Sequence, residues 1–385
     1  MTERVEQRAI ISGIGISRIG RKTGLAGITL TAEASRQAIA DAGLTPTDID
    51  GIATIGDTPL DEVVADLGLD VGYTGGGFDT GGLLSPLMSA FVAVGSGRAR
   101  HVLVYRTVLM MAGTIEAPPS DRDPDDESLW GVMGDMGPLL ACHAYSAANW
   151  IGMQATRYMH LYGSTKEQLG WLAVNSRRNA ALNPLAIYQE PMTIDDYMAA
   201  RMISTPIGLY DCDVPVDGSI AIVVSAADHE PDCPNPAVRV ASIGGSPSLG
   251  GWVDRPDYPA MAASDAAAQL WAGTDVRPGD VDIAEIYDGF TFLTFAWLEA
   301  LGLCGRGEAG PFIEGATRIA LDGQLPVNTY GGQLSAGRMH GYWVIHEAVL
   351  QLRGHAGPRQ VAHPPEVAVT AAGGGPIAGA ILLTR

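Results

Sequence analysis

The stretch ASRQAIADAGLTPTDID at residues 34–50 returns 232 positions later as AAAQLWAGTDVRPGDVD at residues 266–282. In each copy, alanines and larger apolar residues at helical spacing precede a Pro-X-Asp-X-Asp turn. In the first copy, Gly43 stands where a helix ends, and the apolar run GIATI at 51–55 follows the turn as a predicted strand. A match kept at one offset over this length indicates a duplicated α/β unit.

Further matches extend the repeat on both sides of this stretch. A β-branched run closed by glycines precedes each copy, RAIISGIG at 8–15 and RVASIGG at 239–245. GLLS at 82–85 opens a predicted helix that ends at Gly95, and GQLS at 332–335 opens its counterpart, which is expected to continue to Gly354. Apolar strands at 219–224 and 379–383 are predicted to close the two halves. We therefore expect two similar α/β halves.

The Pro/Asn/Asp-rich link at 231–236 marks the boundary between the halves. The prediction is an N-terminal half over residues 1–230 and a C-terminal half over residues 237–385. Residues from about 108 to 213 have no counterpart in the second half, so they are read as an inserted loop and helical region. An insertion of this length either covers an active site or forms a satellite cluster.

Composition narrows the classes of function. The chain has 385 residues with 46% hydrophobic and 17% charged residues, which is typical of a globular protein. Its formal charge of −19 repels phosphate backbones and anionic lipids, so nucleic acid is not an expected partner. The four cysteines lie far apart, and no apolar run approaches the ~18 residues of a membrane span. We expect a cytoplasmic protein without a membrane span, a metal site or a disulfide framework.

Three motifs resemble the thiolase superfamily, with the branch similar to sterol-carrier-protein thiolases matching best. They are LYDCDVPVDGS at 209–219, NTYGG at 328–332 and GGG at 373–375. The resemblance covers nearly the whole chain. It implies a five-layer α-β-α-β-α fold in which two duplicated halves share central helices.

The departures from that family concern its catalytic groups. Thiolases use a cysteine nucleophile at a turn before a buried helix, a histidine in a Gly-His-Pro stretch and a second cysteine beside the C-terminal glycines. The corresponding positions here hold Asp79, Arg338 and Ala372. The resemblance therefore carries no acyl-enzyme chemistry to this chain.

Other polar residues stand where the family keeps its catalytic ones. EIYDGF at 285–290 replaces the thiolase Asn-Glu-Ala-Phe and places Tyr287 at the catalytic strand end, while His340 and Tyr342 follow Arg338 closely. This constellation is similar to that of the steroid side-chain-cleaving aldolases. These thiolase relatives split a β-hydroxyacyl-CoA by retro-aldol reaction, which needs a base for the β-hydroxyl and donors for the thioester enolate.

The resemblance assigns roles to these residues. Tyr287 is the candidate base, if the charge of Arg338 lowers the pKa of its phenol. His340 is placed on the enolate side, and His340 or Tyr342 is the alternative base. The remaining candidates are expected to contact the substrate, and they are Asp79, Asp288, Gly332 and Gly374. The backbone N–H groups of the two glycines are the expected donors to the thioester oxygen.

Each candidate also has a purely structural interpretation. Tyr287 can be a core tyrosine, His340 and Tyr342 can cap or pack the helix that follows, and Asp79 has the position of a helix N-cap. Cys212 and Cys304 are interpreted as buried apolar residues rather than nucleophiles. Three polar groups gathered in one pocket would favour catalysis over binding alone.

The sequence thus predicts a carbon–carbon lyase that converts a β-hydroxyacyl-CoA with a bulky, steroid-like group into a ketone and a shorter acyl-CoA. A thiolase or acyltransferase and a non-catalytic acyl-CoA-binding relative are the alternatives. No permanently bound cofactor is expected, because the CoA thioester is the substrate. By resemblance we expect a homodimer and a small accessory protein built from an OB-fold and a zinc ribbon.

Overall fold

The computed structural model describes residues 3–56, 58–78, 80–111, 136–247 and 251–385. The predicted site residue Asp79 and residues 112–135 of the predicted insertion lie outside the described residues. Within the described part, nine strands form one mixed sheet in the order β3-β2-β4-β7-β1-β8-β11-β10-β9. Their bounds are β1 (Ala9–Ile16), β2 (Gly51–Thr54), β3 (Tyr73–Gly76), β4 (His101–Leu109), β7 (Asp217–Ala226), β8 (Val238–Pro247), β9 (Ile283–Ile286), β10 (Val367–Gly374) and β11 (Ile377–Thr384).

The two ends of this sheet repeat one strand pattern. In the N-terminal half, β2 and β4 are parallel, whereas the β4–β7 and β7–β1 pairs are antiparallel. In the C-terminal half, β9 and β10 are parallel, whereas the β10–β11 and β11–β8 pairs are antiparallel. β1 and β8 pair only through Ile10–Arg239 and Ile11–Val238, so the sheet is two similar sheets joined at a narrow contact. The predicted duplication of the fold is confirmed, while the exact domain boundaries stay a prediction.

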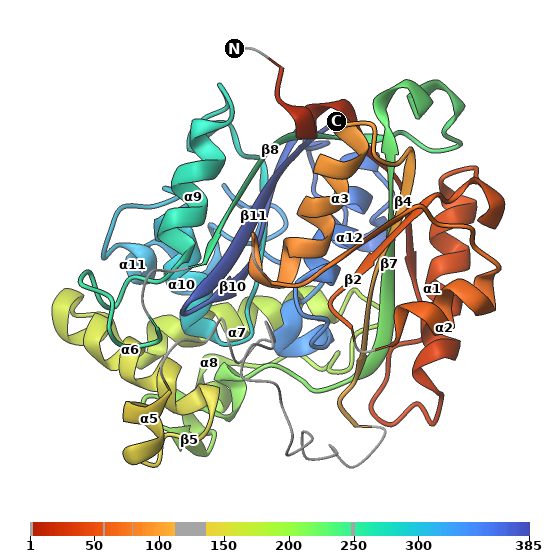
Figure 1. Cartoon of the computed structure of the whole chain (residues 1–385). Coiled ribbons are helices and arrows are strands. Elements are labelled where there is room, and N and C mark those ends of the chain that lie inside the picture. Colours follow the sequence, from red (N-terminus) through yellow and green to blue (C-terminus); the bar gives the residue numbers. More distant parts are fainter. Residues whose placement is uncertain (1–2, 57, 79, 112–135, 248–250) are drawn as a thin grey trace.

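Helices separate and cover the two sheets, as Figure 1 shows. From right to left in that view lie α1 and α2, the β2–β4–β7 sheet, the central pair α3 and α12, the β8–β11–β10 sheet, and α9 with its neighbours. These are the five predicted layers. The bounds of these helices are α1 (Gly27–Asp41), α2 (Leu60–Leu67), α3 (Ser85–Gly95), α9 (Ala263–Ala272), α10 (Thr291–Ala300), α11 (Ala309–Ile313) and α12 (Tyr342–Arg353).

The buried apolar residues follow the same layers. One cluster joins α3 and α12 to both sheets, with Phe91 and Trp343 among its largest members. A second lies between α9, α10 and the C-terminal sheet, and a third lies between α1, α2 and the N-terminal sheet. Both central helices are covered from both sides, so α3 is apolar nearly all round and α12 is buried nearly throughout, including its polar residues Glu347 and Gln351.

Glycines in the strands let the outer helices approach closely. A Cβ on Gly13 of β1 would lie 2.1 Å from the carbonyl oxygen of Ala38 in α1. A Cβ on Gly244 of β8 would lie at the same distance from the carbonyl oxygen of Ala266 in α9. The duplicated halves therefore use one packing device, small residues on both strand and helix.

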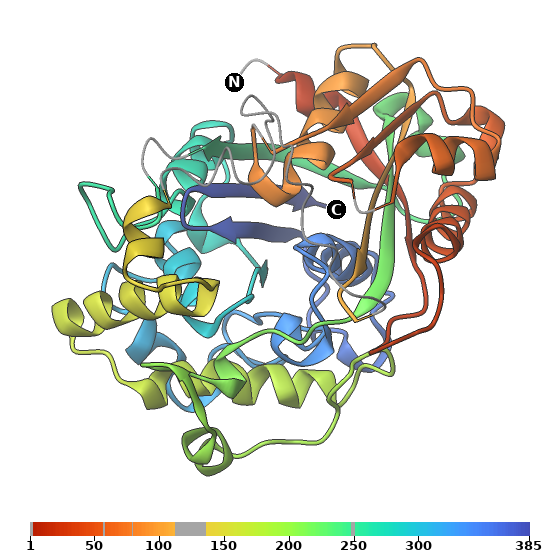
Figure 2. The ribbon, with the colours of Figure 1, turned by 60° about the horizontal axis from the view of Figure 1, so that its bottom comes forward.

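The predicted insertion contains four described helices and a two-stranded hairpin. Figure 2 shows them, in yellow to green, beside the blue C-terminal half and away from the red N-terminal helices. Two of them contact α10. Their bounds are α5 (Gly137–Ala141), α6 (Ala147–Tyr162), α7 (Lys166–Ala180), α8 (Ile194–Ala199), β5 (Met202–Ser204) and β6 (Ile207–Gly208).

The helix predicted from Gly332 to Gly354 is interrupted, and that prediction is wrong in one respect. A π-helical turn covers Gly332–Ala336, and α12 starts only at Tyr342. Between them, Gly337, His340 and Gly341 all have positive φ. Because these angles are incompatible with a right-handed helix, the segment leaves the helix axis and frees Arg338 and His340 to face a cavity. Across the described residues, no helix is long and apolar enough to cross a membrane.

Candidate active site

A cavity of about 280 Å³ opens where several strands end. Its polar wall comes from the end of β4, the segment after β6, the end of β9 and the 337–341 turn. An apolar wall faces it, with side chains from α6 and α10. The described residues that line the cavity are Phe78, Leu83, Arg106, Ala147, Trp150, Ile151, Asp213, Trp252, Tyr287, Phe290, Leu293, Arg338, His340, Gly373, Gly374 and Ile377.

Backbone hydrogen bonds tie three distant loops together around this cavity. The Asp213 N–H donates to the Gly289 carbonyl (3.2 Å), and the Val214 N–H donates to Gln333 (2.9 Å). The Arg338 N–H donates in turn to the Val214 carbonyl (2.8 Å). Asp213 and Arg338, which are far apart in sequence, are thereby held at one place.

Tyr287 follows β9 directly, and its N–H continues the ladder by donating to the Ala371 carbonyl of β10 (2.8 Å). Its phenol lines the cavity, as predicted from its strand-end position. Burial raises the pKa of Tyr287, the charge of Asp213 raises it further, and Arg338 lowers it without cancelling the rise. Arg338 therefore acts in the predicted direction, but the phenol is neutral in this structure. The sequence-based role of a phenolate base is not supported by this balance.

Asp213 lies beside Arg338 and was not among the predicted site residues. An Arg338 guanidinium nitrogen, Nη1, lies 3.4 Å from Asp213 Oδ1, and the Nε donates toward the Met110 sulfur (3.0 Å). Burial raises the pKa of the Asp213 carboxyl to about 6, against the lowering effect of Arg338. A carboxylate with this pKa is ionised at neutral pH and still able to take up a proton.

His340 reaches the cavity from the turn before α12. Its Nδ1 lies 2.6 Å from Nη2 of Arg106, a buried residue of β4. Burial and the charges of Arg106 and Arg338 hold the pKa of His340 well below its usual range. The imidazole is therefore neutral.

Two predicted substrate contacts, Asp288 and Gly332, lie behind the cavity wall rather than in it. Asp288 Oδ1 accepts a hydrogen bond from the Gln333 N–H (2.7 Å), and burial raises its pKa to about 7. A Cβ on Gly332 would lie 1.9 Å from Asp288 Oδ2, so glycine is required where the loop meets this carboxylate. Both residues shape the 331–337 segment.

Of the predicted site residues Tyr342 and Gly374, only Gly374 lines the cavity. Tyr342 is fully buried in the central cluster and is not among the lining residues, and burial raises the pKa of its phenol. It packs at the start of α12, which matches the structural interpretation of this residue. Gly374 lines the cavity at the end of β10, as predicted.

Sequence reasoning missed Arg106, Asp213 and the aromatic wall. Trp150 of α6 and Trp252 lie with ring centroids 5.0 Å apart. Asp213 stood inside the quoted LYDCDVP motif, so a signal for it existed. No sequence signal marked Arg106, because it lies in a buried strand. Its position became clear only from the antiparallel pairing of β4 with β7.

No cysteine is among the described lining residues of the cavity. Cys212 directly precedes the lining residue Asp213 in sequence, but burial and the charge of Asp211 raise the pKa of its thiol to about 12. The thiolase nucleophile therefore has no thiol counterpart in this part of the structure.

Comparisons with known proteins identify the family of this chain. The 17-hydroxy-3-oxo-4-pregnene-20-carboxyl-CoA lyase of Mycobacterium tuberculosis is 36% identical over 97% of this chain and 99% of its own length. The steroid side-chain-cleaving aldolase of Thermomonospora curvata is 34% identical over 97% of each chain. A family model described as thiolase C-terminal domain-like matches residues 250–383.

Solved structures with a similar fold include an aldolase and a thiolase-like protein. An aldolase described as Ltp2-ChsH2(DUF35) superimposes with a TM-score of 0.89 at 32% identity, covering 98% of both chains. A monomeric SCP2-thiolase-like protein from Mycobacterium smegmatis has a TM-score of 0.70 at 17% identity, covering all of this chain and 78% of its own, and shows the fold alone. The resemblance predicted from the motifs is confirmed, and the chain belongs to the steroid side-chain-cleaving aldolases of the thiolase superfamily.

Proposed function

We propose that this protein cleaves a β-hydroxyacyl-CoA thioester by a retro-aldol reaction, releasing a ketone and a shorter acyl-CoA. The observation that carries the proposal is a thiol-free cavity in which a phenol, a carboxylate and a neutral imidazole converge beside two glycines. Acyl transfer needs a nucleophile there, whereas carbon–carbon cleavage needs only acid–base groups and oxyanion donors.

The reaction starts with removal of the β-hydroxyl proton. Asp213 is the base that suits neutral pH, because its carboxylate is ionised above a pKa of about 6. The neutral phenol of Tyr287 hydrogen-bonds the β-oxygen and orients it. The bond between the α-carbon and the β-carbon then breaks. The electron pair of the former O–H bond forms the ketone C=O, and the electron pair of the broken carbon–carbon bond forms the thioester enolate.

The enolate oxygen is met by donors on the opposite side. His340 N–H and the backbone N–H of Gly374 supply them, as fixed dipoles aimed at the position where negative charge develops. The proton taken from the β-hydroxyl is matched by one delivered to the α-carbon, so the reaction is balanced without an oxidant or reductant. We propose that no permanently bound cofactor takes part.

The apolar wall suits a bulky ring system as the departing ketone. Trp150, Trp252 and Phe290 offer flat faces, and Leu293 and Ile377 fill between them. A fused, largely apolar ring would bury its surface here, at about 25 cal/mol per Å². The steroid substrates named for two relatives support this choice of substrate class.

We further propose a homodimer and a small accessory protein of the OB-fold and zinc-ribbon type, acting in the cytoplasm. The DUF35 partner named with the similar solved aldolase supports the accessory protein. CoA is anionic and the chain carries a net charge of −19, so binding relies on local cations such as Arg338, whose side chain is 28% exposed.

A substrate panel tests the proposal. Purified protein is incubated with β-hydroxyacyl-CoA thioesters bearing a steroid ring, a small ring or a linear chain, with and without the accessory protein. Equal amounts of ketone and shorter acyl-CoA from the ring substrates are expected. A second reaction contains acetoacetyl-CoA and free CoA. Rapid thiolysis there, without cleavage of any β-hydroxy substrate, would replace the lyase by a thiolase, and binding without turnover would leave a non-catalytic relative.

A further inference from the structure

The contact between Arg106 and His340 constrains the imidazole more tightly than packing alone. Arg106 belongs to β4, is 5% exposed and pairs across the sheet with Ile220 of β7. Its Nη2 lies 2.6 Å from Nδ1 of His340, 234 residues away in sequence. Both residues line the cavity.

The chemistry of the two groups decides the direction of this hydrogen bond. A guanidinium has five N–H donors, no acceptor, and stays protonated in proteins. His340 Nδ1 must therefore accept. In a neutral imidazole the other ring nitrogen then carries the hydrogen, so the tautomer is Nε2–H.

We propose that Arg106 is a positioning residue that holds His340 in the Nε2–H tautomer, so that this N–H is the donor offered to the thioester oxygen. The inference rests on the proposed function for its purpose, but the tautomer itself does not depend on any reaction. A carboxylate partner at Nδ1, as in hydrolytic triads, would instead fix the opposite tautomer and make the imidazole a base. The cationic partner thus assigns His340 to the enolate side.

The surroundings of His340 agree with this assignment. The charged and titratable groups around the cavity are Arg106 from β4, Arg338 from the preceding turn, Asp213 after β6 and Tyr287 after β9. The nearest cations disfavour a second ring proton, since Arg106 and Arg338 both lower the pKa of His340. The backbone fixes the ring as well, because His340 has φ of 49° and the next residue, Gly341, packs against Ala372 too closely for a side chain.

Nitrogen NMR of the histidine rings tests the tautomer without any substrate. The protein is labelled with ¹⁵N-histidine, and His340→Asn, which tolerates a positive φ, identifies the signals of His340 among the eight histidines. In the parent protein we expect an unprotonated Nδ1 and a protonated Nε2, and this pattern should persist as the pH falls through the ordinary imidazole pKa of 6.5. Arg106→Met should produce a mixture of tautomers and an upward shift of the His340 pKa, because a cation is lost. Arg106→Lys retains a donor and should preserve the parent pattern.

Kinetics then separate positioning from folding. Arg106→Met should lower kcat by about 10²-fold, the usual effect of one oxyanion donor, with a small change in KM, and Arg106→Lys should recover most of the loss. A protonated Nδ1 in the parent protein would overturn the proposal, and this result needs no variant to fold. An unchanged tautomer in Arg106→Met would overturn it too. If the tautomer responds as expected but no ring substrate is cleaved, the proposed function fails while the positioning role stands.

Discussion

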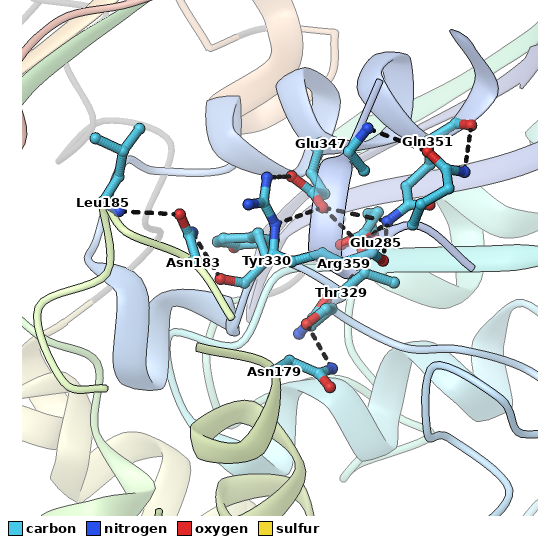
Figure 3. A network of polar contacts seen from close by, with 12 residues as sticks. Asn179, Asn183, Leu185, Glu285, Thr329, Tyr330, Glu347, Gln351 and Arg359 are labelled. Carbon is cyan, nitrogen blue, oxygen red and sulfur yellow. Dashed lines mark hydrogen bonds and ion pairs between the residues drawn. The ribbon is translucent and has the colours of Figure 1, made fainter. Parts of the chain in front are cut away.

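Glu285 and Tyr287 stand two residues apart at the end of β9, and two different polar clusters form around them. Glu285 enters a network with Thr329, Glu347, Gln351 and Arg359, which we call the closed network (Figure 3). Tyr287 belongs to the cavity cluster, which comprises Arg106, Asp213, Tyr287, Arg338 and His340. The closed network is buried, whereas Arg106 alone is fully buried in the cavity cluster, and each cluster combines at least one carboxyl group with arginine.

The closed network uses its polar groups on one another. Thr329 Oγ1 lies 2.6 Å from Glu285 Oε1 and 3.0 Å from Glu347 Oε1, and it also accepts from Gln351 (3.0 Å). Arg359 binds Glu347 through two nitrogens, at 3.1 and 2.9 Å. One hydroxyl hydrogen cannot serve two carboxylates, so one of the two carries a proton, and because Arg359 binds Glu347 we assign that proton to Glu285. Burial and the charge of Glu347 raise its pKa accordingly.

Carboxyl and guanidinium groups occur in both clusters, and the difference is where these groups point. In the closed network, carboxyl and guanidinium groups meet inside the protein and join β9, α12 and the 357–361 segment. In the cavity cluster, the same groups face a volume that a substrate can enter. Perturbed pKa values therefore mark both places, and only the cavity distinguishes a reaction site from a structural one.

The largest expected effect belongs to the phenol of the cavity cluster. Tyr287→Phe removes the hydroxyl that orients the β-oxygen and should lower kcat by about 10³-fold, the upper end for the loss of one aligned donor, with little change in substrate affinity. Tyr342→Phe is the matched control, because that hydroxyl is buried outside the cavity and has no hydrogen-bond partner among the described residues. Steady-state kinetics on a ring substrate measure both. Equal losses in the two variants would contradict the separation of Tyr287 from Tyr342.

The carboxylate of the same cluster should control the acidic limb of the pH profile. Asp213→Asn should lower kcat by about 10²–10³-fold, because an amide accepts no proton. In the parent enzyme, activity should fall as pH drops through about 6, where Asp213 becomes protonated. The control is Asp211→Asn, two residues away, where the carboxylate binds Lys166 (2.9 Å) outside the cavity. That variant should lose stability and keep the acidic limb, and an unshifted limb in Asp213→Asn would exclude Asp213 as the base.

Sequence reasoning predicted the fold well because the duplication leaves a strong periodic record. Strands, outer helices and their glycines recur in both halves, and each copy supports the assignment of the other. The break at 337–341 was missed, since Gly337 and Gly341 look like ordinary helix glycines until their φ values are known. Local sequence patterns indicate helix propensity, but they do not show which side chains face the cavity where a helix is interrupted.

The site was predicted only where the family motif marks a position. Tyr287, Arg338, His340 and Gly374 stand at such positions and share the cavity. Asp288 and Tyr342 are near these residues in sequence, yet Asp288 bonds the Gln333 N–H and Tyr342 packs at the start of α12, so both are buried. Arg106 and Asp213 arrive through strand pairing and backbone bonds between loops, which are long-range contacts that no local pattern encodes.

In the closed network, we expect stability rather than turnover to respond. Glu347→Gln leaves Arg359, which is 8% exposed, without its carboxylate and should lower the free energy of unfolding by about 3–5 kcal/mol. Glu285→Gln replaces a protonated acid by an amide of similar shape and should cost less than about 1 kcal/mol. Urea unfolding at pH 7 measures both. A larger loss of unfolding free energy for Glu285→Gln than for Glu347→Gln would show that Glu347, and not Glu285, carries the proton.

The pH dependence of unfolding sharpens this assignment. The folded-state pKa of Glu285 lies above its ordinary value of 4.5, so its contribution to stability is complete below pH 4.5. That contribution is lost as the pH rises toward the folded-state pKa. Glu285→Gln should therefore flatten the stability profile above pH 4.5, whereas kcat on a ring substrate should stay close to the parent value.

The smallest effect is expected from the thiols, which belong to neither cluster. Burial raises the pKa of Cys212 and of Cys304 to about 12 and also raises that of Cys233, while Cys142 is exposed. Because the thiolate is the reactive form, iodoacetamide at pH 7.5 should label Cys142 alone and leave kcat within about twofold of the untreated enzyme. Mass spectrometry locates the label, and Cys142→Ser should abolish it. If labelling of Cys212 removed activity and a CoA thioester protected it, a thiol would have to join the cavity cluster, and the lyase mechanism would yield to covalent catalysis.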